Sequence, residues 1–172
     1  NSRFSAMLAQ VSEQADSDTC HRWLQTLKET QGGWYQLLRR EAAKDLEGTK
    51  RSLIRACRSL DWLEQRPQEA VRLAVLSAQV TSDPHALDSG TLCGKLFLYL
   101  LAFSSHQKYP ENAEQRDGLY YENGILCDSI SSLVTQTGLV LHVGAEEHPA
   151  YRLFRQAREI CTLSLSSLSG LT

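Results

Sequence analysis

Apolar side chains recur at helical spacing in the first third of the chain. Phe4, Leu8 and Val11 lie on one face of a predicted first helix. A second helix, for which Asp18 is a suitable N-cap, carries the apolar residues Trp23, Leu24 and Leu27. Gly32 and Gly33 then interrupt the pattern before Trp34, Leu37 and Leu38. This part of the chain therefore predicts short amphipathic helices that share one core.

The clearest helical pattern covers Leu46–Leu63. Leu46, Leu53, Cys57 and Leu60 share one face, at spacings of 7, 4 and 3 residues. Pro67 suits the start of a following helix, whose apolar residues are Val71, Leu73, Ala74, Leu76 and Val80.

A polar turn, Thr81–Gly90, leads directly into a segment that is apolar nearly all round, Thr91–Ser105. The eight residues Leu96–Phe103 are all apolar. A helix without a polar face is typical of the centre of a domain, so we expect this helix to be buried.

The segment His106–Asn112 is polar, contains Pro110 and is the best candidate for a linker. Beyond it, the pattern predicts mixed elements: helices near Ala113–Glu122, Asp128–Gln136 and Pro149–Arg158, and extended segments at Leu139–Val143 and Ile160–Leu165. The predicted fold class is therefore mainly α, with a helical bundle at 1–106 followed by a small α+β, winged-helix-like module at 112–172.

Composition agrees with a globular chain and excludes several classes of function. Of the 172 residues, 42% are hydrophobic and 22% are charged, and the net charge of −2 favours no general attraction to nucleic acid or acidic membrane. The longest apolar run has eight residues, whereas a membrane-spanning helix needs roughly 20. The chain opens on Asn1 without a methionine, so we expect a fragment or a processed protein.

Five cysteines lie 34 to 37 residues apart without a CxxC pair: Cys20, Cys57, Cys93, Cys127 and Cys161. Zinc knuckles need ligands two to four residues apart, so this spacing predicts no zinc site. We expect reduced core cysteines in a cytoplasmic protein and no cofactor in this part of the protein.

The turn before the buried helix has two interpretations. Asp83, His85 and Asp88 are suitable ligands for a divalent cation such as manganese or zinc. The simpler interpretation is structural: Asp88, Ser89 or Thr91 caps the helix, Asp83 forms an Asx turn, and His85 bonds to backbone. We favour the structural interpretation, because the free N–H groups of a buried helix end must be satisfied.

A row of basic residues is the best candidate for DNA contact. Arg40, Lys44, Arg51, Arg55 and Arg58 share one side if Arg40–Leu63 forms one continuous helix. Such a row is able to contact phosphates without base-specific geometry. Glu47 lies within it and Gly48 is a potential break, so a solvated charged face is the alternative.

Two stretches resemble a known family. DPHALDSGTLCGKLFLYLLA at 83–102 and GILCDSISSLVTQTGL at 124–139 are similar to the N-terminal region of the JetD-type nuclease subunits of bacterial Wadjet plasmid-defence systems. In that family a Toprim-like catalytic domain follows this region. The resemblance therefore implies a region that is not itself an enzyme and that positions the metal-dependent nuclease on DNA or docks it to partner subunits.

A second resemblance covers residues 116–146. This stretch is similar to the winged-helix domain of topoisomerase VI A subunits, in which a tyrosine near an Arg-acid pair is the nucleophile. Here Arg116 and Asp117 precede Tyr120 and Tyr121, with one residue more than that motif has. These tyrosines are therefore weak catalytic candidates, and packing is the simpler role for them.

The expected recognition helix, Asp128–Thr137, contains no lysine or arginine, and only Gln136 suits base contact. Arg152, Arg155 and Arg158 follow at a spacing of three residues and are candidates for backbone contacts. The resemblance to the JetD-type family implies other subunits of an SMC-type defence complex as partners. We also expect duplex DNA without sequence specificity and a second copy of the chain, but no membrane. A pure protein-interaction domain and a tyrosine-dependent strand-cleaving module remain the alternatives.

Overall fold

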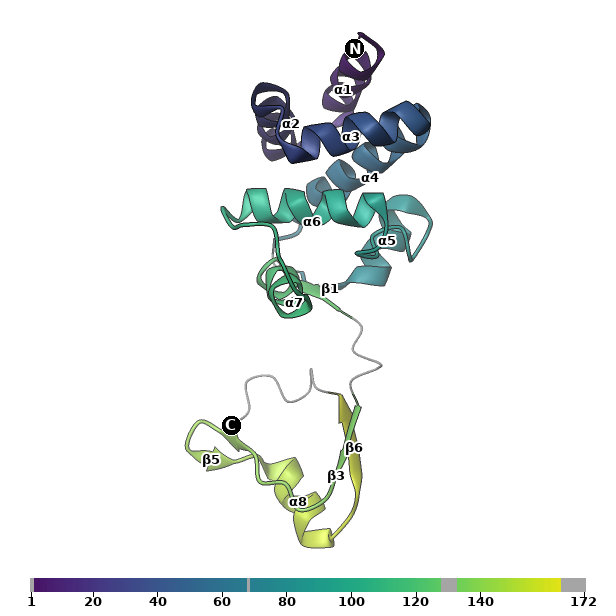
Figure 1. Ribbon diagram of the computed structural model, residues 1–172. Coiled ribbons are helices and arrows are strands. Elements are labelled where there is room, and N and C mark those ends of the chain that lie inside the picture. Colours follow the sequence, from purple (N-terminus) through teal and green to yellow (C-terminus); the bar gives the residue numbers. More distant parts are fainter. Residues whose placement is uncertain (1, 68, 128–132, 165–172) are drawn as a thin grey trace. The chain divides into compact units, whose positions relative to one another are not determined.

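A computed structural model describes residues 2–67, 69–127 and 133–164, and the chain divides into two compact units (Figure 1). Unit 1 is Asn1–Cys127 and unit 2 is Asp128–Thr172. The fold is mainly α with a few short strands, which confirms the predicted fold class.

The described residues of unit 1 form seven helices and one pair of short strands. The helices are α1 (Ser2–Gln14), α2 (Asp18–Thr30), α3 (Gly33–Lys44), α4 (Leu46–Glu64), α5 (Leu73–Thr81), α6 (Leu92–Ser104) and α7 (Ala113–Glu122). Helix α6 runs through the middle of the unit, with α1–α4 on one side and α7 on the other (Figure 1). Its most extensive contact is with α4.

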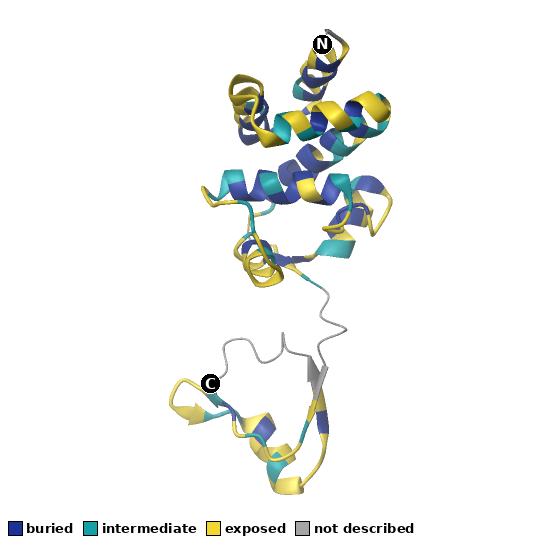
Figure 2. Cartoon of the chain, viewed as in Figure 1, coloured by how far each residue is buried: buried dark blue, intermediate teal, exposed yellow. Residues whose placement is uncertain are grey.

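The burial of the helices follows the apolar pattern of the sequence. Leu96, Phe97 and Leu100 of α6 are all inaccessible to solvent, because neighbouring helices cover α6 on more than one side (Figure 2). In α1 the predicted face of Phe4, Leu8 and Val11 is buried. The core of unit 1 is thus one continuous apolar cluster.

The start of α2 is capped by Ser17, whereas the sequence indicated Asp18. The Ser17 hydroxyl accepts hydrogen bonds from the backbone N–H groups of Thr19 (3.0 Å) and Cys20 (3.4 Å). Asp18 is instead the first helical residue, where its charge favours the positive end of the helix dipole. The buried Asp61 carboxylate of α4 accepts from the N–H of Ser17 at 3.0 Å, so the turn before α2 is tied to α4.

Asp45 divides the helix that the sequence predicted to be continuous over Arg40–Leu63. Its extended backbone (φ −147°, ψ 96°) ends α3 and begins α4. The Asp45 carboxylate accepts from the N–H of Gly48 at 2.8 Å. Gly48 therefore lies in the capped first turn of α4 and does not split that helix.

A short parallel pair of strands closes unit 1. Strand β1 (Val71–Arg72) pairs with β2 (Ile125–Leu126), and the Val71 N–H donates to the Gly124 carbonyl at 2.9 Å. The helix expected after Pro67 therefore begins only at Leu73. The pairing also places α7 and β2 in unit 1, so the units separate after Cys127 rather than at the polar segment 107–111.

The described part of unit 2 is a small α+β structure. Strand β3 (Leu133–Gln136) pairs antiparallel with β6 (Cys161–Ser164), and β4 (His142–Val143) pairs antiparallel with β5 (Glu146–Glu147). Helix α8 (Pro149–Ala157) lies between β5 and β6 in the sequence. Leu141, Tyr151 and Cys161 form its small buried core.

The helix predicted near Asp128–Gln136 is wrong over 133–136. Residues 128–132 lie outside the described residues, and Leu133–Gln136 form β3. Val134 and Thr135 are β-branched, which favours a strand, and Thr135 bonds across the pair to Thr162 at 2.9 Å. The predicted extended segment 139–143 is a strand only at its end, whereas the helix near 149–158 and the strand near 160–165 are confirmed.

Candidate nucleic-acid interface

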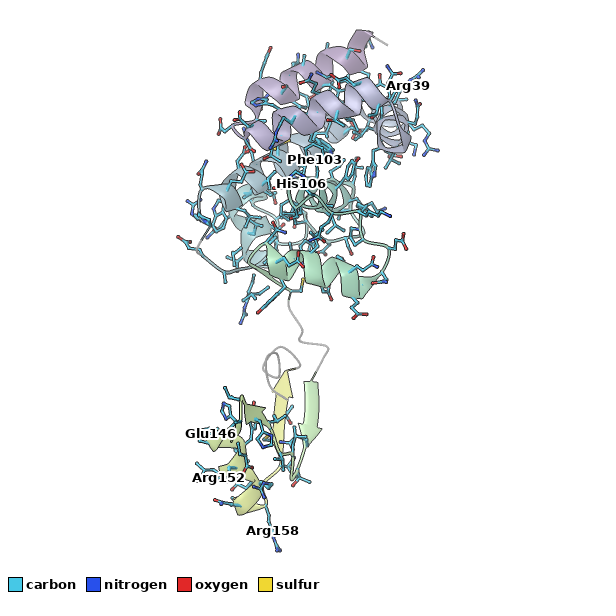
Figure 3. All side chains as sticks on the ribbon, turned by 90° about the vertical axis from the view of Figure 1, so that its left-hand side faces the viewer. Arg39, Phe103, His106, Glu146, Arg152 and Arg158 are labelled. Atoms are coloured by element: carbon cyan, nitrogen blue, oxygen red, sulfur yellow. The ribbon has the colours of Figure 1, made fainter. Side chains whose placement is uncertain are left out.

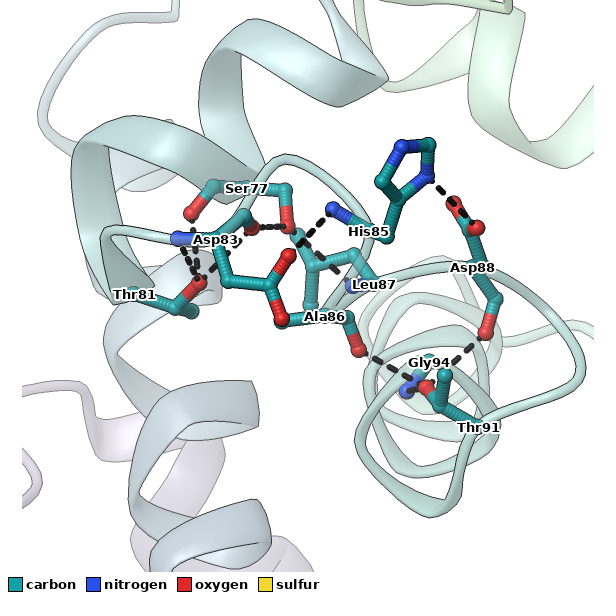
Figure 4. Close-up of polar contacts among 9 residues, drawn as sticks. All are labelled: Ser77, Thr81, Asp83, His85, Ala86, Leu87, Asp88, Thr91 and Gly94. Atoms are coloured by element: carbon teal, nitrogen blue, oxygen red, sulfur yellow. Dashed lines mark hydrogen bonds and ion pairs between the residues drawn. The ribbon is translucent and has the colours of Figure 1, made fainter.

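The turn before α6 is held by its own side chains (Figure 4). Thr91 caps α6, because its hydroxyl accepts from the N–H of Gly94 at 2.9 Å. Asp83 forms the expected Asx turn, accepting from the N–H of His85 at 2.9 Å. The His85 ring pairs with the Asp88 carboxylate at 3.0 Å, whereas the sequence indicated a bond to backbone.

Two residues of α5 complete this network, and sequence reasoning did not include them in it. The buried Ser77 hydroxyl donates to the Asp83 carbonyl (2.6 Å) and accepts from the N–H of Leu87 (3.1 Å). The Thr81 hydroxyl is also 2.9 Å from the Asp83 carbonyl. Except for the His85–Asp88 pair, these bonds serve the backbone of the turn, which supports its structural interpretation.

The structure gives no support to a metal site in this turn. Within residues 2–67, 69–127 and 133–164, no three His, Cys, Asp or Glu side chains lie close enough to hold an ion. His85 and Asp88 are both largely exposed, with 79% and 53% of their side-chain surface accessible. They form a surface pair.

The tyrosines of α7 differ sharply in environment. Tyr120 is buried beside Phe97, and its hydroxyl has no hydrogen-bond partner within the described residues. Burial raises the pKa of the Tyr120 hydroxyl, which is the opposite of what a nucleophile needs. Tyr121 is 67% exposed and points away from the core.

The polar residues around the tyrosines pair with other groups. Arg116 donates to its neighbour Asp117 at 2.9 Å and lies 3.4 Å from the Ser89 hydroxyl. Glu122 accepts from the side chain of Gln107. Within the described part of the chain, neither carboxylate hydrogen-bonds to a tyrosine hydroxyl, so these contacts give the tyrosines no general base.

Three of the predicted basic residues share the exposed side of α4. Arg51 and Arg58 are exposed and Arg55 is half-buried between them. None of the three makes an ion pair within the described part of the chain. From Arg51 to Arg58 the helix rises about 10 Å, which equals roughly three nucleotide steps measured along the axis of duplex DNA.

The same face continues to two residues that the sequence analysis did not single out. Trp62 follows Arg58 by four residues and is half-buried on α4. The Arg66 guanidinium lies over its ring, 4.4 Å from the ring centre, and bonds to the Trp62 carbonyl at 3.4 Å. We call Arg51, Arg55, Arg58, Trp62 and Arg66 the arginine face. In the sequence, this face is indicated by the spacing of three or four residues between its members, which continues past Arg58.

The remaining basic candidates of unit 1 lie on a separate helix. Arg40 and Lys44 are exposed on α3, which ends before α4 begins. Lys44 already pairs with Glu41 at 2.8 Å. Because Asp45 ends α3 and begins α4, the basic residues that were predicted to form a single row lie in two groups on two helices.

The basic candidates of unit 2 lie on and next to α8. Arg152 and Arg158 are exposed (Figure 3), whereas Arg155 forms a two-pronged ion pair with Glu147 at 2.7 and 2.9 Å. Gln136 is also engaged, because its side chain bonds to the Cys161 sulfur and to the N–H of Leu139. Of these four, only Arg152 and Arg158 are without a side-chain partner among the described residues.

Four of the five cysteines, Cys20, Cys57, Cys93 and Cys161, are buried, as expected of core cysteines. Among the described helices, none has the length and apolar character that a membrane crossing needs.

Fold and surface together define a mainly α protein with an arginine-bearing helix and a small α+β second unit. Residues 1–141 match the family described as "Protein of unknown function N-terminus (DUF3323)", and the chain belongs to that family. No curated protein and no solved structure matches the chain.

Proposed function

We propose that this chain is the non-catalytic N-terminal region of a JetD-type nuclease subunit of a Wadjet plasmid-defence system. Its role is to hold the cytoplasmic protein on duplex DNA and to dock it to itself or to SMC-type partner subunits. The resemblance of residues 83–102 and 124–139 supports this proposal. The family description also refers to an N-terminus, and an N-terminal region is what the proposal requires.

The arginine face of α4 carries the DNA part of the proposal. Arg51, Arg55 and Arg58 share one side of α4 by helical spacing, Arg66 follows just after the end of the helix, and none of the four forms an ion pair with a described acidic side chain. Arginine suits phosphate because its planar fork donates two parallel hydrogen bonds. The row offers no set of amide side chains for base edges, so it supports binding to the backbone without sequence preference.

The salt dependence of DNA binding tests this role. We expect a labelled duplex to bind the chain at 50 mM salt, measured by fluorescence anisotropy. If about three phosphates are neutralised, affinity falls roughly 40-fold between 50 and 200 mM salt. The double variant Arg51→Glu with Arg58→Glu abolishes binding, because both side chains are exposed and both charges reverse.

A matched control separates the arginine face from charge in general. Arg22→Glu with Lys28→Glu makes the same change in net charge at two exposed positions of α2. This control variant is expected to bind DNA almost as the unchanged protein does. The proposal is refuted if the duplex does not bind at 50 mM salt, or if the two double variants weaken binding equally.

A protein-interaction role without DNA contact is the second candidate, and the surface of unit 2 favours it. The described residues of this unit expose five large apolar side chains: Val140, Val143, Leu153, Phe154 and Ile160. Acidic residues also outnumber basic ones by 8 to 4 over residues 109–172, a range that includes α7 of unit 1, and by 4 to 3 within unit 2 itself. This candidate gains support if Leu153→Ser with Ile160→Ser reduces self-association in sedimentation while DNA binding is absent.

A further inference from the structure

A cavity of about 420 Å³ opens between α1 and α3, away from the residues of the arginine face. Three cationic side chains line it: Arg3 of α1, and Arg39 and Lys44 of α3. The volume is within the range of about 300–1,000 Å³ that is usual for small-molecule sites. The cavity is about half open to solvent, and its volume is large enough for an organic ligand.

The floor of the cavity is apolar, and its side chains are packed against neighbouring residues. Phe4 and Ala42 are buried members of the core, and Leu46 adds the first residue of α4. The ring of Phe4 meets that of Tyr35 edge to face, with 5.3 Å between the ring centres, which fixes α1 against α3. The small side chains of Ala42 and Ala43 on the cavity wall leave the space open.

The cations around the floor are incompletely neutralised. Lys44 pairs with Glu41 at 2.8 Å, but Arg3 and Arg39 make no ion pair within residues 2–67, 69–127 and 133–164. Both arginines are exposed. Like charges that converge on one cavity are unfavourable until an anion lies between them.

We propose that this cavity binds a mononucleotide: a phosphate ester on an apolar, aromatic group. The guanidinium groups of Arg3 and Arg39 hold the phosphate by charge-assisted hydrogen bonds. The nucleobase packs against the half-buried Leu46 and the exposed Ala43, over the buried ring of Phe4. The same chemistry is present in a free nucleotide and in the 5′-phosphorylated end of a strand. The site does not depend on DNA binding by α4.

Calorimetric titration with AMP, adenosine and inorganic phosphate tests the proposal. We expect AMP to bind at least about tenfold more tightly than either part, because only AMP uses both the cations and the floor. A 5′-phosphorylated oligonucleotide that displaces AMP identifies a strand end as the ligand; no displacement identifies the free nucleotide. The cavity proposal is wrong if AMP produces no heat at millimolar concentration or binds no better than phosphate.

Three variants locate the binding. Arg3→Glu with Arg39→Glu is expected to weaken AMP binding at least about tenfold, through loss of charge-assisted bonds. Ala43→Leu fills the cavity from an exposed position without a change of charge, and it is expected to weaken AMP binding similarly. Arg22→Glu on α2 is the charge control and leaves binding unchanged. Unaltered AMP binding in Ala43→Leu also overturns the proposal.

The test is independent of the proposed function. Arg51→Glu with Arg58→Glu removes duplex binding in the earlier experiment but leaves AMP binding intact. Failure of the proposal for the cavity and failure of the proposal for the arginine face are therefore distinguishable. Circular dichroism of each variant verifies that its helices are retained.

Discussion

At the scale of single residues, the Tyr120 hydroxyl allows a direct test of the packing role of this side chain. It is buried without a hydrogen-bond partner among the described residues, so its removal deletes a polar group that is already unsatisfied. We expect Tyr120→Phe to leave the free energy of unfolding unchanged or to raise it by up to about 1 kcal/mol. Denaturant unfolding measures this, and Tyr121→Phe at an exposed position is the control. A loss of more than about 1 kcal/mol would mean that the hydroxyl has a partner after all.

The same tyrosines show what sequence reasoning resolves at this scale and what it does not. The expectation of packing is confirmed for Tyr120, because Tyr120 and the preceding Leu119 are buried whereas the following Tyr121 is exposed. The Ser17 cap was missed, because Ser17 and Asp18 are both good caps and only the backbone geometry separates them. The burial of Ser77 was missed because its partners, Asp83 and Leu87, lie six and ten residues away.

At the scale of elements, α6 and the turn before it depend on one glycine. A Cβ atom at Gly94 would lie 2.1 Å from the carbonyl oxygen of Asp88 and 2.6 Å from that of Leu87. Both are backbone atoms, so the turn must move to make room. We expect Gly94→Ala to destabilise the protein by about 1–3 kcal/mol, although alanine is the better helix former.

A second helical glycine is the matched control for Gly94. Gly118 of α7 is exposed, and a Cβ atom there would have no neighbour within 4 Å. Gly118→Ala is therefore expected to stabilise the protein by roughly 0.5–1 kcal/mol. Thermal unfolding of the two variants gives shifts of opposite sign. Shifts of the same sign would show that the turn does not pack closely on α6.

The elements that were predicted well are those whose pattern is long and local. The helix near 46–63 differs from α4 by one residue at its C-terminal end, and the buried helix near 91–105 differs from α6 by one residue at each end. The failures were at Asp45, where one side chain serves two helix ends, and at β3, which is stabilised by a strand more than twenty residues away. The arginine face was partly predicted, because helical spacing alone groups Arg51, Arg55 and Arg58.

At the scale of the whole molecule, the boundary between units is where sequence and structure differ most. The segment 107–111 has the composition of a linker, yet α7 packs on α6 and β2 pairs with β1. The Tyr109 ring lies 5.1 Å from that of Trp34, which draws the segment itself onto the helices. Composition indicates that a segment is a polar loop, but it does not show that the elements after the loop pack on the same core as those before it. The unit boundary after Cys127 depends on those long-range contacts.

Truncation tests the position of this boundary. A chain of residues 1–127 keeps every element of unit 1, and we expect it to unfold cooperatively. A chain of residues 1–111 loses Leu119, Tyr120 and Ile125, each of which is at most 2% exposed. Burial of each such side chain contributes about 1.5–3 kcal/mol, so their loss together approaches the whole stability of a typical domain, about 5–15 kcal/mol. Circular dichroism melts are expected to show a sharp transition for the longer chain and a broad or much lower one for the shorter. Equal melting temperatures would instead place the boundary at the polar segment, because α7 and β2 would then contribute nothing to the stability of the helices before them.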